Sequence, residues 1–230
     1  MLKLFRRFRE KRIRKLEKEY SRPSFAQEGE DLILEVHFQG KKTPGFYVDV
    51  GAFHPFRFSN TYLFYKKEWR GINIDATPGA MSAFERHRPR DINLQQPIAN
   101  GRHELPFYMF NEPALNGFSK TFSEDRATGP YHITKTISLQ TALLGDVLDE
   151  HLPPGQSIDF MSVDAEGLDL DVLRSNNWDK YRPEVVLAEA ADGTGIEAVM
   201  NSEPCRFMRE RGYDLMARTP RTVFFQRRSA

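Results

Sequence analysis

The chain has 230 residues, a length that fits one sizeable domain with or without a short appendage. Hydrophobic residues make up 40% of it and charged residues 28%, close to the averages of soluble globular proteins, which argues against a disordered or membrane-embedded chain. The single cysteine, Cys205, excludes an internal disulfide and a zinc site built from cysteines. A reducing cytoplasm is the expected location.

Positive charge is concentrated at the N-terminus. The formal net charge is +1, but residues 1–20 hold nine Lys or Arg against three Glu, so they carry +6 and the rest of the chain carries −5. We expect residues 1–22 to form a basic helical appendage. It is either a solvated helix that packs on the domain or an amphipathic helix on an anionic membrane surface or an acidic partner. The apolar residues on one face of this helix are Leu2, Phe5, Ile13, Leu16 and Tyr20.

From residue 23 onward, short apolar runs alternate with helix-compatible stretches, which is typical of an α/β sheet. Buried parallel strands are expected at Phe46–Val50, Gly71–Asp75, Ile92–Gln96, Ile158–Asp164 and Glu184–Glu189. Helices are expected at Glu28–Phe38, Thr61–Lys67, Gly79–His87, Ser138–Leu148, Leu168–Ser175 and Pro204–Arg211. A hairpin of Tyr213–Arg218 and Thr222–Gln226 closes the chain. The predicted fold is therefore a Rossmann-like domain over residues 23–230, with a mostly parallel sheet and a C-terminal antiparallel hairpin.

Residues 97–135 are less regular. Phe107–Phe110 has the composition of another strand, whereas Asn111–Tyr131 carries Asn, Gly, Pro and Ser at the density of a loop. Because a long loop inside a compact domain usually has a function, we predict a lid that covers a substrate.

The run Asp49-Val50-Gly51-Ala52 ends the first predicted strand. In an open α/β sheet, ligands bind beyond the carboxyl ends of strands, and a glycine there lets the backbone approach a ligand closely. Phe53 and His54 follow, so the G-x-G-x-x-G pattern that holds a pyrophosphate is missing. The turn predicts a ligand site that is not a dinucleotide site.

Carboxylates end two further predicted strands. Asp75 can accept hydrogen bonds from ribose hydroxyls, or it can be a helix N-cap before Thr77-Pro78. Asp164 and Glu166 are two residues apart, so on an extended segment they would point the same way and could bind a cation or act as a general base. Alternatively, Glu166 stabilises the start of the following helix.

Two more side chains could join this site. His54 can act as a general base or can simply pack and bond the backbone. Glu189 ends its strand at the same sheet edge as Asp164, so Asp164, Glu166 and Glu189 could hold a divalent cation, Mg²⁺ or Mn²⁺. An ion pair of Glu189 with a basic residue is an equally ordinary role for it.

Several ordered blocks of the chain resemble the FkbM-type methyltransferases, over roughly residues 24–227. The resemblance implies a Rossmann-like fold and methyl transfer from S-adenosylmethionine (SAM), usually to an oxygen. The blocks are Gln27–Leu32, Val48–Ala52 with His54-Pro55, Ser59–Tyr62, Trp69–Asp75 and Asp159–Gly167.

The same resemblance implies a role for residues at matching positions. Asp49, Gly51 and Ala52 would lie near the methionine part of SAM, Asp75 on the ribose, and Gln96 to Ile98 near the adenine, while Ser59 and Asn60 would face the cofactor. Asp164 and Glu166 would enter the active site, and the general base would be one of them or, next in order, His54. At position 75 the family more often has glutamate.

The expected acceptor is a hydroxyl of a sugar, of a glycan or glycolipid precursor, or of a secondary metabolite, and the basic N-terminus favours a lipid-linked or anionic one. Nucleic acid is not expected, because residues 21–230 carry −5. Two other interpretations stay open: a SAM-binding scaffold without catalysis, and a hydrolase with a metal held by Asp164, Glu166 and Glu189.

Overall fold

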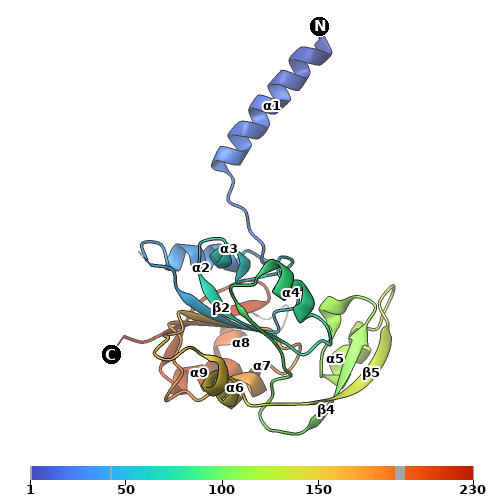
Figure 1. The fold of residues 1–230 in the computed structure, drawn as a ribbon, viewed down its shortest axis with the longest axis vertical. Helices are drawn as coiled ribbons and strands as arrows, with labels where there is room; N and C mark the ends of the chain where they lie inside the picture. Colours follow the sequence, from blue (N-terminus) through green and yellow to red (C-terminus); the bar gives the residue numbers. More distant parts are fainter. Residues whose placement is uncertain (1, 42, 190–194, 230) are drawn as a thin grey trace.

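Five apolar runs form the parallel part of the central sheet in this computed structural model, which describes residues 2–41, 43–189 and 195–229. They are β1 (Phe46–Val50), β2 (Arg70–Asp75), β3 (Ile92–Gln95), β6 (Phe160–Val163) and β7 (Val185–Glu189). The sheet has seven strands in the order β3-β2-β1-β6-β7-β9-β8 (Figure 1). The two C-terminal strands, β8 (Tyr213–Arg218) and β9 (Thr222–Arg227), form the expected hairpin, and β9 runs antiparallel to both neighbours. The predicted Rossmann-like fold is confirmed.

Alternate residues of the strands supply two apolar layers. Val48, Val50 and Met161 belong to a core on one face of the sheet, together with residues of α6 (Leu144–His151), α7 (Asp169–Ser175) and α9 (Glu203–Glu210). Tyr47 and Phe160 belong to a second core with residues of α2 (Glu30–His37) and α3 (Tyr62–Tyr65). Two further helices belong to the domain: α4 (Met81–His87), which buries Phe84, and α8 (Ile196–Met200), which buries Val199.

An insertion between β3 and α6 forms a separate two-stranded ladder of β4 (Glu104–Phe110) and β5 (Ile133–Gln140). The expected strand at Phe107–Phe110 is thus part of a longer one. The expected loop between these strands contains a 3-10 turn, η1 (Pro113–Leu115), and the helix α5 (Lys120–Arg126), whose first turn is capped by the hydroxyl of Ser119. In Figure 1 the insertion lies at one end of the sheet.

The prediction of a helix over Ser138–Leu148 is wrong in its first part. Ser138 and Gln140 pair with Pro106 and Glu104 in the ladder, and α6 begins only at Leu144. The apolar spacing after Leu143 is helical, but the residues before it are drawn into a strand by a partner more than thirty positions away in the chain.

Helix α1 (Leu2–Tyr20) stands away from the rest of the chain (Figure 1). The segment that follows it is attached by an ion pair of Arg22 with Glu35 and by the hydroxyl of Ser24, which donates to Asp31. Among the described residues, no helix has both the length and the apolar composition that crossing a bilayer requires.

Candidate functional site

A cavity of about 420 Å³ opens at the carboxyl ends of the central strands. Its floor includes Gly51 after β1, Asp75 at the end of β2, Asp164 after β6 and Glu189 at the end of β7. Its outer wall comes from residues 112–118 and Arg126 of the insertion. The sheet order reverses between β1 and β6, and a crevice at such a point is where open α/β sheets bind ligands.

Gly51 is where three strand ends converge. It has a φ of 81°, and a Cβ atom there would lie 1.7 Å from the carbonyl oxygen of Asp164. Its N–H donates to the carbonyl of Ile74, and the N–H of Asp164 donates to the carbonyl of Val50 (both 2.9 Å). The close approach of the Asp164 backbone therefore requires a glycine at this position, whether or not a ligand also approaches it.

Three residues expected near the cofactor lie behind the cavity wall rather than on it. The Asp49 carboxylate accepts a hydrogen bond from the Thr61 hydroxyl (2.8 Å), and burial raises its pKa to about 6. Ser59 is buried and accepts the N–H of Tyr62, while Ala52 packs with Met81 and Phe84. These side chains support the turn below the cavity.

The other expected cofactor residues line the cavity. Asp75 accepts the N–H of Phe53 and the N–H of Thr77, one on each carboxylate oxygen (both 2.7 Å), and burial raises its pKa. Asp75 therefore orders the loop before α4, a role similar to the capping role considered for it. It also lines the cavity. Asn60, held by a hydrogen bond to Ser162 (3.0 Å), lines the cavity, as do Gln96 and Ile98.

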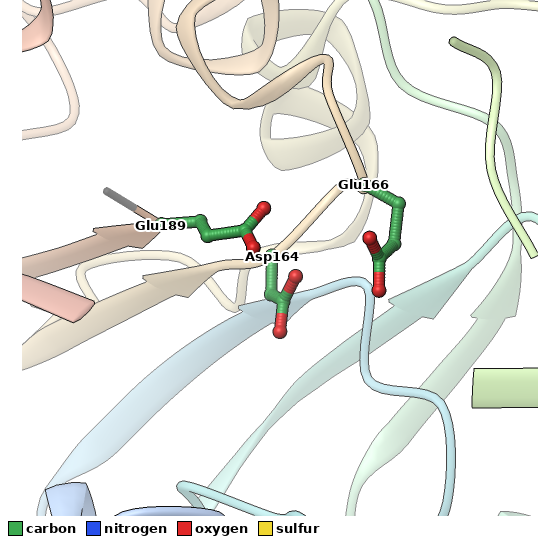
Figure 2. Close-up of side chains that lie close together, drawn as sticks. All are labelled: Asp164, Glu166 and Glu189. Atoms are coloured by element: carbon green, nitrogen blue, oxygen red, sulfur yellow. The ribbon is translucent and has the colours of Figure 1, made fainter. Parts of the chain in front are cut away.

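Three carboxylates meet on the floor of the cavity. Each of Asp164, Glu166 and Glu189 offers a carboxylate oxygen within 4.8 Å of the others, and Figure 2 shows Asp164 and Glu189 at strand ends and Glu166 on the loop beyond. The expected reason for this meeting was wrong, however. The segment after β6 is not extended: Glu166 has a φ of 48° and Gly167 a φ of 95°, so a turn brings the two carboxylates together.

The three carboxylates have different electrostatic environments. Glu166 forms an ion pair with Arg126 of α5. Asp164 is open to the cavity, yet protein atoms crowd its other sides, and within the described part of the chain no group hydrogen-bonds its carboxylate. The pKa of Asp164 is raised well above its ordinary value, first by this desolvation and then by the negative charges of Glu166 and Glu189.

The insertion and the turn after β6 pack against each other through glycines. A Cβ atom at Gly117 would lie 2.9 Å from Cβ of Glu166, and one at Gly167 would lie 2.8 Å from Cβ of Ser119. Arg126 adds its ion pair to Glu166 at the same place. Arg126 was not among the residues expected at the site, and its only signal in the sequence was its position near the end of the expected lid.

An aromatic wall was missed as well. Phe53 and Phe58 both have positive φ, and their rings lie nearly parallel with centroids 6.3 Å apart. The guanidinium of Arg57 lies 4.5 Å from the Phe58 ring centroid and also pairs with Glu112 across the cavity (3.0 Å). The dense aromatic composition after Gly51 is the signal that could have indicated this wall.

His54 has the second of the two roles considered for it. Its Nδ1 accepts the N–H groups of Phe56 and Arg57, at 3.1 and 3.0 Å, and its ring packs edge-on against Phe56. Burial, followed by the charge of Arg57, lowers its pKa. The described residues that line the cavity do not include His54.

Comparison with known proteins identifies the family of the chain. Among curated proteins, no sequence matches the chain significantly. A solved structure of a candidate RNA methyltransferase from Pyrococcus horikoshii is similar, with a TM-score of 0.43 and 9% identity over 90% of this chain and 92% of that one, a likeness too distant to carry an argument. The profile of the methyltransferase FkbM domain matches residues 49–215, from within β1 to within β8. The chain therefore belongs to the FkbM methyltransferase family, as its sequence blocks predicted.

Proposed function

We propose that this methyltransferase transfers a methyl group from SAM to a hydroxyl oxygen of a sugar, a glycan or glycolipid precursor, or a secondary metabolite. One observation carries the proposal: Asp75 and the carboxylate of Asp164, which has no hydrogen-bond partner among the described residues, line the same cavity at the carboxyl ends of parallel strands.

The cavity suits the proposed cofactor in size and in polar groups. Its volume of about 420 Å³ falls within the range of small-molecule sites, roughly 300–1,000 Å³. Each oxygen of Asp75 accepts one backbone N–H and keeps a lone pair for a ribose hydroxyl. Gln96 and Ile98 lie on the same wall, where the family resemblance implies the adenine. The surplus of carboxylates complements a sulfonium.

The proposed base is Asp164. Bound SAM would supply an electrophilic methyl group on a cationic sulfur. The acceptor oxygen forms the new O–C bond, the C–S bond breaks with its electron pair going to sulfur, and the hydroxyl proton passes to a base. Asp164 suits this role better than Glu166, because Arg126 already neutralises Glu166, and better than His54, whose Nδ1 is engaged by two backbone N–H groups.

The divalent cation considered from the sequence is not tested by the geometry, and we propose that the reaction does not require it. Asp164, Glu166 and Glu189 offer the oxygen ligands that Mg²⁺ or Mn²⁺ prefers, but Arg126 supplies charge compensation at the same place. We expect methyl transfer to persist after exhaustive chelation followed by gel filtration. Loss of activity that only added Mg²⁺ or Mn²⁺ restores would bring the metal into the mechanism.

Two measurements test the cofactor assignment. SAM is expected to raise the melting temperature of the protein, and Asp75→Ala is expected to weaken SAM binding about 10- to 100-fold by calorimetry, the usual range for losing hydrogen bonds to a charged group. Asp146→Ala is the matched control, because it removes an exposed carboxylate that pairs with Arg102 and is not among the residues that line the cavity. A wild-type protein that SAM neither stabilises nor binds would contradict the proposal and favour the metal-dependent hydrolase.

The scaffold interpretation needs a separate readout. SAM binding without formation of S-adenosylhomocysteine across a panel of sugars and lipid-linked sugars would favour the scaffold interpretation. Formation of that product in the presence of one acceptor would exclude the scaffold interpretation.

A further inference from the structure

Helix α1 presents an unusual surface that the catalytic site does not use. Its 19 residues hold nine Lys or Arg and three Glu, and every residue from Arg9 to Tyr20 is exposed. Three large apolar side chains, Ile13, Leu16 and Tyr20, are 41%, 46% and 81% exposed. By helical spacing these three lie on one face, with Arg9 and Arg12 on or beside it.

This helix lacks the packing that usually stabilises helices. It stands away from the sheet and its covering helices (Figure 1), whereas most helical stability in proteins comes from packing an apolar face against the rest of the fold. A helix of this kind gains stability when a surface covers that face.

We propose that α1 binds an anionic lipid surface, lying in the plane of the membrane with Ile13, Leu16 and Tyr20 toward the bilayer. The charge of +6 complements acidic headgroups, and the apolar face complements the acyl boundary, where tyrosine is a common residue. Arg9 and Arg12 can extend along the apolar face and reach phosphates with their guanidinium groups. A nucleic acid would use the charges but leave the apolar residues exposed.

The connection to the domain gives this binding a consequence for the site. Residues 21–26 join α1 to the domain, a span of about 20 Å at most when fully extended. Within this segment, Arg22 and Ser24 contact α2 through Glu35 and Asp31, and Gln27, Glu28 and Glu30 line the cavity. A membrane-bound α1 therefore keeps the cavity close to the bilayer, where a lipid-linked acceptor would be presented.

The experiment measures binding of the full chain to vesicles by sedimentation. We expect binding to vesicles of phosphatidylcholine with phosphatidylglycerol, no binding to phosphatidylcholine alone, and weakening as salt is raised. A charge variant is expected to bind at least about 100-fold more weakly, since each basic residue near an anionic surface contributes a factor of about five. It changes four residues of α1 to Gln: Arg9, Arg12, Lys15 and Lys18.

Two further variants separate insertion into lipid from attraction by charge alone. Ile13→Ser with Leu16→Ser keeps every charge and is expected to weaken vesicle binding about 10-fold, in line with the value of partly burying two aliphatic side chains. The matched control changes four exposed basic residues of the domain to Gln and is expected to bind normally: Arg70, Arg86, Lys120 and Lys135.

Three results would overturn the proposal: binding to neutral vesicles as strong as to anionic ones, equal loss in the control and charge variants, or no effect of the two serines. The last result combined with tight binding to RNA or an acidic protein would assign α1 to that partner. Because vesicle binding requires no SAM, a failure here is distinguishable from a failure of the proposed reaction, which the SAM thermal shift reports separately.

Discussion

The cavity has two sides that are held in different ways. On the sheet side, the ends of β1, β2 and β6 are joined by backbone hydrogen bonds and by the contact of Gly51 with the carbonyl of Asp164. On the insertion side, half-buried ion pairs contribute to the closure, Arg126 with Glu166 and Arg57 with Glu112. Backbone contacts in a packed sheet allow little displacement, whereas partly exposed ion pairs contribute little energy and can reopen. We infer that the sheet side of the cavity is rigid and that the insertion side can open.

The largest expected effect comes from breaking the rigid side. Gly51→Ala would place a methyl group 1.7 Å from a backbone oxygen, so we expect a loss of at least about 4 kcal/mol in the free energy of unfolding, measured in urea, and loss of SAM binding. Gly79→Ala is the matched control, because its φ of 83° is nearly the same but no atom lies within 4 Å of its added Cβ. We expect that control to cost only about 1–2 kcal/mol. Equal losses in the two variants would show that strain in φ, rather than the Asp164 contact, accounts for the glycine.

The next effect concerns chemistry on the floor of the cavity. Asp164→Asn is expected to lower kcat about 10²- to 10⁴-fold, the usual contribution of a general base, while SAM affinity by calorimetry stays near that of the wild type. Because a base acts when deprotonated and the pKa of Asp164 is raised, the wild-type rate should increase with pH through a range above that of an ordinary carboxylate. If the Asp164→Asn variant keeps the full kcat of the wild type, Asp164 is not the general base. Glu166→Gln, with its smaller expected effect on kcat, is the comparison variant.

A third effect links the rigid side to pH. Burial raises the pKa of Asp49 from 3.8 to about 6, so the folded chain holds a proton that the unfolded chain has released between these values. Stability from this group is therefore present below about pH 4 and is lost as pH rises through about 6, by up to about 3 kcal/mol. Asp49→Asn should flatten this part of the curve of unfolding free energy against pH. If the unfolding free energy of the variant still differs between acidic and neutral pH as much as that of the wild type, other groups cause the pH dependence of stability.

The smallest expected effect concerns the insertion side. Arg126→Met removes a partly exposed ion pair, so the free energy of unfolding should fall by less than about 1 kcal/mol. Amide hydrogen exchange in α5 and η1 should nevertheless accelerate, while exchange in β1 and β6 stays slow. Carboxyl titration by NMR should place the pKa of Asp164 higher than in the wild type, because a nearby positive charge is lost. Arg102→Met, which breaks an exposed pair with Asp146, is the control, and equal exchange in both variants would contradict an opening insertion.

Different parts of the site were predictable to different degrees. Asp75, Asp164 and Glu189 were placed correctly at one edge of the sheet, because they end apolar runs and parallel strands bring their carboxyl ends together. The meeting of Glu166 with Asp164 was also expected, but for a wrong reason, since a turn with a positive φ at Glu166, packed against Gly117, brings the two carboxylates together. Periodicity in the chain contains no information about such a contact.

By itself, the sequence determined the sheet, its closing hairpin, the family and the strand ends around the cavity. Each of these depends on apolar patterning within a few residues or on motifs in a fixed order. The tertiary structure decided that Asp49 and Ser59 support the cavity from below, that Ser138–Gln140 is strand, and that Arg126 closes on Glu166. These features depend on partners distant along the chain, and the free energy that selects them comes from packing and charge pairing that exist only once the sheet has formed.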